Sequence, residues 1–282
     1  MATDLTWQLV SLRDIERSAL VRATVMSAKA LDELVLSDAL ENPNASSRAA
    51  KMRDTTVNRR TSQGDTHLDN ANSMISSSCL AAADHMRAFA VSLRSKRTTV
   101  ANWTIARGTI EALSRANYVL LAEDSAALLA RYVALAHLEF AFAGHSTYVV
   151  RDAGVIDPKE YLVHLDEMLV ELGIARIKPP RITEMASDLL ESTAPGSGGR
   201  GRYSQLSAAA HGQSPALGMF RAADKGQLML PRNLALEVVH MQIGCALAVG
   251  DRILRHFGVD GEGRVKWSAA RRASLEQLGI GP

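Results

Sequence analysis

Cysteine, proline and aromatic residues are scarce in this chain of 282 residues. Its two cysteines, Cys79 and Cys245, stand far apart in apolar stretches, which argues against a disulfide framework and predicts two buried thiols. The eight prolines fall mostly at apparent boundaries between elements. Aromatic residues make up 5%, whereas alanine and leucine dominate the apolar set, and these two have the highest helix propensities. The composition therefore favours helices.

The chain also lacks an excess of either charge and a long apolar run. Its 32 Lys and Arg face 30 Asp and Glu, and a strong nucleic-acid-binding protein usually has a clearer basic excess. Local basic patches stay possible. No apolar run reaches the ~18 residues of a membrane span, and the start "MATDLTWQLV" does not resemble a signal peptide. We therefore expect a cytoplasmic protein without membrane contact.

Apolar residues recur at helical spacing along most of the chain, and no segment alternates like a strand. This pattern predicts an all-α protein, an antiparallel bundle of about eight helices with peripheral N- and C-terminal helices. We expect one domain over 1–282, with its core at 66–257, mobile loops at 43–65 and 193–202, and a C-terminal helix at 265–279. The N-terminal helix packs on this core or is exchanged within a homodimer.

Local signals place several helix boundaries. Asp157 is a good N-cap, Pro158 suits the first helical position and Gly173 suits the residue after the end. Ser11 and Asp14 have the spacing of a capping pair for the first long helix, which the sequence "NPN" ends. The polar, basic segment that follows predicts a short exposed helix and then a loop.

One predicted helix, "TIARGTIEALSRANY", carries a polar stripe. Arg107, Glu111, Arg115 and Tyr118 fall within a narrow arc at 3.6 residues per turn. If this face is exposed, the stripe is a ladder of weak ion pairs. If it faces another polar stripe inside the bundle, arginines beside a carboxylate form a site for an anion or a phosphate.

A second stripe lies in "RYSQLSAAAHGQ", directly after the glycine-rich "TAPGSGGRG". Tyr203, Ser207 and His211 are each four residues apart, so they share one helical face, and Gly212 ends the helix. A serine near a histidine invites a nucleophile–base interpretation. The chain has no G-x-S-x-G elbow, and three alanines after Ser207 suit helix packing. An acid–base or ligand-contacting His211 is the stronger hypothesis.

Two further motifs occur about as often as chance predicts. Di-iron bundles need two Glu-x-x-His pairs, and "EVVH" supplies one, Glu237 and His240. The Arg-x4–6-His pattern of helical RNases matches "RTSQGDTH", which ends at His67, and "RYVALAH", from Arg131 to His137. We therefore expect no metal site and no cofactor.

The order "RGTIEALSR" and then "YSQLSAAAHG" resembles a family of uncharacterised bacterial all-helical proteins of the DUF5677 kind. That family has a similar Arg-x3-Glu helix and a Tyr-x2-Leu-Ser-x3-His element, and the resemblance covers residues 70–255. It implies a helical fold. A more distant similarity to HEPN-like domains, many of them RNases, implies action on RNA, although this chain lacks their well-placed Arg-x4–6-His motif.

Three functions stay open at this point. The first is a HEPN-like, metal-independent effector acting on phosphodiesters or RNA, in which arginines hold the phosphate and a histidine moves the proton. The second binds or converts a small anionic ligand in the bundle core. The third is structural or dimerising, without catalysis. The candidate residues are the catalytic set His211, Glu111 and Tyr203 and the ligand-binding set Arg107, Arg115, Ser207 and Tyr118.

Overall fold

The computed structural model describes residues 11–55, 66–95, 99–141, 148–150, 154–220 and 228–279, and most of these residues are helical. The all-α class is confirmed. The described part forms twelve helices, more than the expected number of about eight. Three of them are short: α2 (Asp38–Glu41), α3 (Arg48–Arg53) and α10 (Ser214–Gly218). Four to six residues are too few to show a helical period in the sequence.

The longer helices and one small hairpin complete the fold. The helices are α1 (Asp14–Val35), α4 (His67–Arg94), α5 (Val100–Leu120), α6 (Ser125–Phe140), α7 (Pro158–Glu171), α8 (Ile182–Thr193), α9 (Gly199–Ala210), α11 (Arg232–Phe257) and α12 (Gly261–Gln277). The antiparallel strands β1 (Tyr148–Val150) and β2 (Gly154–Ile156) pair with Val149 opposite Val155. Strands of three residues cannot show a clear alternation, so the sequence did not predict them.

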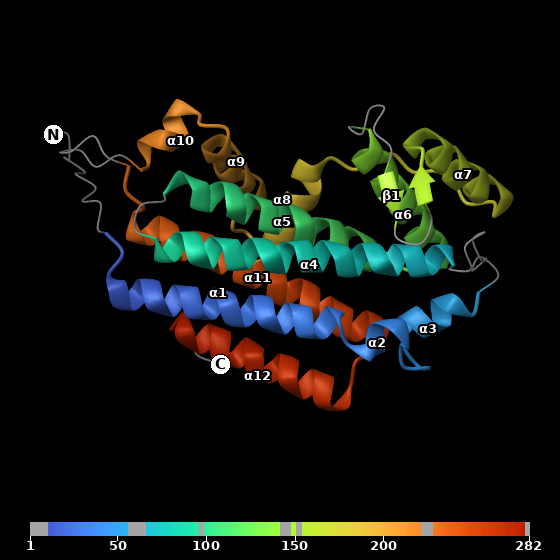
Figure 1. Ribbon diagram of the computed structural model, residues 1–282, viewed down its shortest axis with the longest axis horizontal. Coiled ribbons are helices and arrows are strands. Elements are labelled where there is room, and N and C mark those ends of the chain that lie inside the picture. The colour runs from blue at the N-terminus through green and yellow to red at the C-terminus, as the bar shows by residue number, and fades with distance from the viewer. Residues whose placement is uncertain are drawn as a thin grey trace.

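Neighbouring helices run mostly antiparallel, as Figure 1 shows for α1, α4 and α12. Between α1 and α12, Arg22 Nε donates to Gln277 Oε1 over 2.9 Å, and Ser27 Oγ bonds to Ser274 Oγ over 3.0 Å. Numbers that rise on one helix while they fall on the other define an antiparallel pair. The helices α5 and α11 form an exception, because their contacts rise together from Thr109–Gln242 to Asn117–Arg252.

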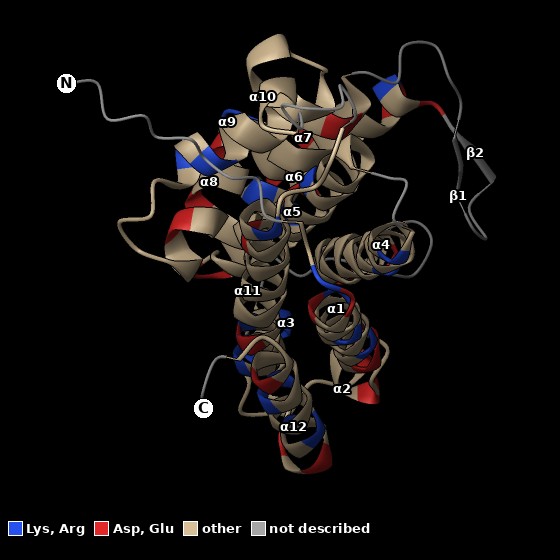
Figure 2. Cartoon of the chain, turned by 90° about the vertical axis from the view of Figure 1, so that its left-hand side faces the viewer, with Lys and Arg blue, Asp and Glu red and all other residues tan. Residues whose placement is uncertain are grey.

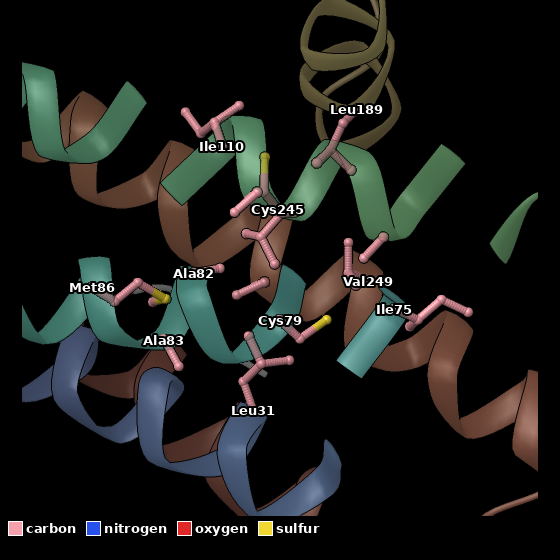
Figure 3. Close-up of a cluster of buried hydrophobic side chains, with 14 of the residues drawn as sticks. Leu31, Ile75, Cys79, Ala82, Ala83, Met86, Ile110, Leu189, Cys245 and Val249 are labelled. Carbon is pink, nitrogen blue, oxygen red and sulfur yellow. The ribbon is translucent and has the colours of Figure 1, made fainter. Parts of the chain in front are cut away.

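The core lies between α1, α4, α5, α8 and α11, whose apolar side chains meet in Figure 3. Cys79 and Cys245 are both free and fully buried in it, as the sequence predicted. Burial raises the pKa of each thiol to about 12, so neither is a thiolate near neutral pH.

The two terminal helices differ in their burial. Ten residues of α1, among them Leu31, are buried against its neighbours, so α1 belongs to the core rather than to the periphery. The core therefore extends beyond the expected range of 66–257. By contrast, α12 buries Trp267 and Ser274 and is peripheral, as expected. Four basic residues of α12 lie between two acidic ones near its ends, and Figure 2 shows the corresponding blue and red segments.

Among the described residues, α11 alone is long and apolar enough to cross a membrane by length and composition. Its 18-residue window has a mean hydropathy of 1.3, and 61% of that window is buried inside the structure. The helix packs against α1, α5, α8 and α12. This burial is what the central helix of a bundle shows, since other helices cover its apolar face.

The structure confirms some of the expected boundaries and corrects others. Asp157, Pro158 and Gly173 stand where the sequence placed them. The first helix is capped by Arg13, whose side chain and backbone both bond to Glu16, and not by Ser11 with Asp14.

Two expected loops also differ. Residues 199–202 form the first turn of α9 and are not part of a mobile loop. In the segment 43–65, α3 is not simply exposed, because it buries Ala49 and Met52, while residues 56–65 lie outside the described part. The C-terminal helix starts at Gly261, earlier than the expected 265.

The start of α9 fits tightly against α8. Gly199 lies so close that a Cβ there would collide with the carbonyl oxygen of Ser187 and stand 2.8 Å from the amide nitrogen of Glu191. The Glu191 carboxylate accepts from the amide of Gly196 over 2.5 Å and from that of Gly199 over 2.8 Å. A carboxylate of the protein thus occupies the helix N-terminus, where backbone amides otherwise attract a bound anion.

We predict that Gly199→Ala destabilises the protein by about 2 kcal/mol, because the new methyl group overlaps backbone atoms of α8. Gly201→Ala is the matched control on the same helix, since nothing lies within 4 Å of its Cβ position. It should be neutral or stabilise by up to ~1 kcal/mol through helix propensity. Urea unfolding measures both, and equal effects of the two variants would contradict the packing account.

Near the end of α11, the imidazole of His256 is buried without a hydrogen-bond partner among the described residues. Its side chain is only 3% exposed. Burial, with the nearby charge of Arg48, lowers the pKa of His256 to about 4. The folded state therefore keeps this ring neutral where an unfolded chain binds a proton.

Between pH 6.5 and about 4, the unfolded state binds a proton that the folded state does not, so stability falls as pH falls. From pH 7 to pH 5, His256 should cost about 2 kcal/mol. His256→Leu removes this contribution, and urea unfolding at both pH values should show a correspondingly smaller loss than in the wild type. The same loss in wild type and variant would show that His256 does not titrate in this way.

Candidate functional site

The two polar stripes meet where α9 crosses α5. Tyr203 Oη donates to Glu111 Oε1 over 2.6 Å, and Arg107 Nη1 lies 2.9 Å from His211 Nε2. The residue numbers run in opposite directions along the two helices, so α5 and α9 are antiparallel. We call Arg107, Glu111, Tyr203 and His211 the α5–α9 cluster.

Glu111 is the centre of this cluster. Its Oε1 accepts from Tyr203 and also from Arg107 Nε, each over 2.6 Å. The Glu111 side chain is 18% exposed and Tyr203 is 2% exposed, so these hydrogen bonds are largely shielded from water. Burial raises the pKa of Tyr203, and its hydrogen bond to the Glu111 carboxylate raises it further. The phenol therefore stays protonated and serves as a donor.

Arg107 links the buried part of the cluster to the surface. Burial disfavours its charge, but the hydrogen bond and the negative charge of Glu111 outweigh this effect, and the pKa of Arg107 is raised. Its guanidinium carbon lies 6.0 Å from the centre of the Tyr203 ring. Arg107 is therefore a fixed cation, held by a carboxylate on one side and directed towards an imidazole on the other.

His211 is exposed and stands at the C-cap of α9, just before Gly212, which has a φ of 66°. An arginine can only donate, so the contact with Arg107 Nη1 requires Nε2 of His211 to accept. The imidazole is then neutral, with its proton on Nδ1. This arrangement leaves an N–H at the surface and a lone pair directed at Arg107.

Three of the candidate residues do not join the α5–α9 cluster. Arg115 turns towards α6, where its Nε lies 3.4 Å from Glu139 Oε1. The ring of Tyr118 lies 4.9 Å from the guanidinium carbon of Arg131, also on α6. The hydroxyl of Ser207 makes no hydrogen bond to a described residue. The sequence predicted one stripe on α5, whereas the structure divides it between two partner helices.

A second polar network, absent from the sequence predictions, joins α6 to α7. His137 Nε2 lies 2.9 Å from Asp166 Oδ1, and Arg176 Nη1 donates to Asp166 Oδ2 over 2.9 Å. Tyr132 and Tyr161 share a hydrogen bond nearby. The two partners in each of these contacts are separated by ten or more positions in the sequence, so no local spacing signals them.

The residues of the two sequence motifs make contacts within the fold and do not form the sites that the motifs suggest. Arg131 Nη1 donates to the carbonyl of Tyr118, and His137 binds Asp166, so this Arg-x4–6-His match forms no joint site. In the other motif, Glu237 pairs with Arg202 at 3.8 Å. Within the described ranges, no group of three or more His, Cys, Asp or Glu side chains could hold a metal ion.

We predict that Tyr203→Phe lowers the free energy of unfolding by about 2 kcal/mol, because it removes a shielded hydrogen bond to a charged group. Glu111→Gln and the double variant complete a mutant cycle, whose coupling energy should exceed about 1 kcal/mol. The matched control is Tyr118→Phe on α5, which should change stability by less than about 0.5 kcal/mol. A coupling energy near zero would mean that the hydrogen bond does not hold α9 to α5.

Comparison with models of protein families, with curated proteins and with solved structures finds no match. The resemblances to the DUF5677 kind and to HEPN-like domains therefore stay predictions.

Proposed function

We propose that the α5–α9 cluster is a metal-independent acid–base site that acts on the phosphodiester bonds of RNA. The observation that carries this proposal is the 2.9 Å contact between Arg107 Nη1 and His211 Nε2. A fixed guanidinium stabilises the charge that develops on a phosphoryl group, and an adjacent imidazole moves the proton.

Two further features support a polymeric substrate. His211 is exposed, so a phosphate on an extended chain can reach it without entering the bundle. Glu111 holds Arg107 through Nε, which leaves donors on the two Nη atoms for phosphate oxygens. Glu111 and Tyr203 are then positioning residues, since they fix the cation but do not touch the reacting atoms.

The reaction that fits these groups is transesterification by the neighbouring 2′-hydroxyl. When a phosphate oxygen accepts the hydrogen bond of Arg107 Nη1 in place of His211, Nε2 of His211 is free to accept the proton of that hydroxyl. The 2′-oxygen forms a bond to phosphorus, the bond from phosphorus to the 5′-oxygen breaks, and the imidazolium returns the proton to the leaving oxygen. The products are a 2′,3′-cyclic phosphate and a 5′-hydroxyl, with no net change in the enzyme.

The test uses a labelled DNA oligonucleotide that contains a single ribonucleotide, with EDTA present throughout. Wild-type protein should cleave at the ribonucleotide and leave a cyclic phosphate. His211→Ala should slow the cleavage about 100-fold or more, because it removes the proton-transferring group. Arg107→Gln should reduce it to a similar degree.

Arg115→Gln is the matched control, since it changes the same residue type on the same helix, but Arg115 pairs with Glu139 outside the cluster. It should leave the rate unchanged, and an all-DNA oligonucleotide should stay intact. If wild-type protein does not cleave the chimeric strand, or if His211→Ala cleaves it as fast as wild type, the proposal is wrong.

A purely structural role for the cluster also has an observation in its favour, because Glu111 already has two donors within the protein. Under that alternative, the cluster joins α9 to α5 and nothing more. Tyr203→Phe would then lower stability, while His211→Ala would change neither cleavage nor any other activity. The two accounts therefore differ in the effect of His211.

A further inference from the structure

An open groove of about 590 Å³ lies on the other side of α9 from Glu111, between the ends of α8 and α12 and the first half of α11. Tyr203 faces α5, but the preceding residue, Arg202, faces α11 and lines this groove. Its volume falls within the range of small-molecule sites, ~300–1,000 Å³. The groove shares no residue with the α5–α9 cluster.

One wall of the groove is apolar. Leu236, Met241 and Ile243 come from α11, and Leu275 and Leu278 come from the end of α12. The side chains of Leu236, Leu275 and Leu278 pack against the core but are only partly buried. They present aliphatic surface to the groove, and an alkyl chain laid against them would remove that surface from water.

The opposite side carries a cation whose hydrogen bonds are not satisfied by the described residues. The Arg202 side chain is 30% exposed, and its nearest acidic oxygen, on Glu237, is 3.8 Å from Nε, beyond hydrogen-bond distance. The Nη atoms therefore keep their donors for another acceptor. A partly desolvated guanidinium gains most from a carboxylate or phosphate, which it can bind through two parallel hydrogen bonds.

His240 completes the polar side of the groove. His240 is exposed as a residue, but partial desolvation of its ring lowers the pKa of His240, and the neutral imidazole offers one N–H donor. Asn233, two turns earlier on α11, adds amide donors. The groove thus combines an aliphatic wall with a cation and neutral donors.

We propose that this groove binds an amphipathic organic anion, with the anionic head at Arg202 and the alkyl chain along Leu236, Leu275 and Leu278. The proposal is independent of the RNA-directed activity. Among the described residues that line the groove, Glu237 alone is acidic, and its charge opposes an anion bound beside Arg202. Removing the charge of Arg202 should therefore weaken binding of the anion, whereas removing the charge of Glu237 should strengthen it.

The probe is decanoate, measured by isothermal titration calorimetry below its micelle-forming concentration. Wild-type protein should bind it saturably. Arg202→Gln should weaken binding about tenfold, because a charge-assisted hydrogen bond is lost, and Glu237→Gln should tighten it. Decanol, with the same chain and no charge, should bind more weakly than decanoate.

Arg200→Gln is the matched control, since Arg200 is exposed on the same helix and does not line the groove. Circular dichroism melting confirms that each variant folds. Leu278→Asp should abolish binding by placing a negative charge on the apolar wall, and His211→Ala should leave it unchanged. Absence of saturable binding overturns the proposal, as does equal binding of decanol and decanoate, or an affinity that neither Arg202→Gln nor Glu237→Gln alters.

Discussion

The carboxylate of Glu111 joins α9 to α5 and positions the other side chains of the α5–α9 cluster. A charge placed between packed helices needs donors, and Tyr203 and Arg107 both supply them to the same oxygen. The bond from Tyr203 fixes the crossing of α9 over α5. The bond from Arg107 holds the guanidinium so that its far side lies against His211. The same interaction therefore stabilises the fold and assembles the candidate site.

The glycine-rich entry to α9 contributes to this geometry through close packing and hydrogen bonds. Gly199 allows α9 to approach the backbone of α8, and Glu191 satisfies the amides at the helix start. With its start fixed against α8, α9 presents Arg202 to one side and Tyr203 to the other. Two sites of different chemistry can therefore share one short helix. One is the polar α5–α9 cluster, which reaches the surface at His211, and the other is a groove with an aliphatic wall.

The class of the fold and the face of α9 could be predicted from the sequence, because both depend on local periodicity. The spacing of Tyr203 and His211 places both on one face of a helix, and the spacing of Arg107 and Glu111 does the same on α5. The sequence could not show which neighbouring helix each side chain of the α5 stripe contacts. Arg115 and Tyr118 belong to the same arc of α5 as Glu111. The later part of α5 packs against α6 instead of α9, so Arg115 pairs with Glu139 and the ring of Tyr118 contacts Arg131.

Other features depended on contacts that no spacing reveals. His137 and Asp166 come together from different helices, and the cap of α1 is an arginine–glutamate pair that does not resemble the usual serine or aspartate signal. The groove beside Arg202 exists because α12 returns along α1 to place Leu275 and Leu278 opposite α11. Tertiary packing determines all of these features, so they could be seen only in the folded chain.

The central claim is that Glu111 fixes Arg107 so that it donates to His211, and the protonation pattern of that imidazole tests it most directly. A long-range ¹H–¹⁵N correlation spectrum of the protein with ¹⁵N-labelled histidine distinguishes the two nitrogens of each ring. At pH 8 the account predicts His211 with its proton on Nδ1 and an accepting Nε2, and a loss of this preference in Arg107→Gln. A His211 ring with its proton on Nε2 would contradict the account.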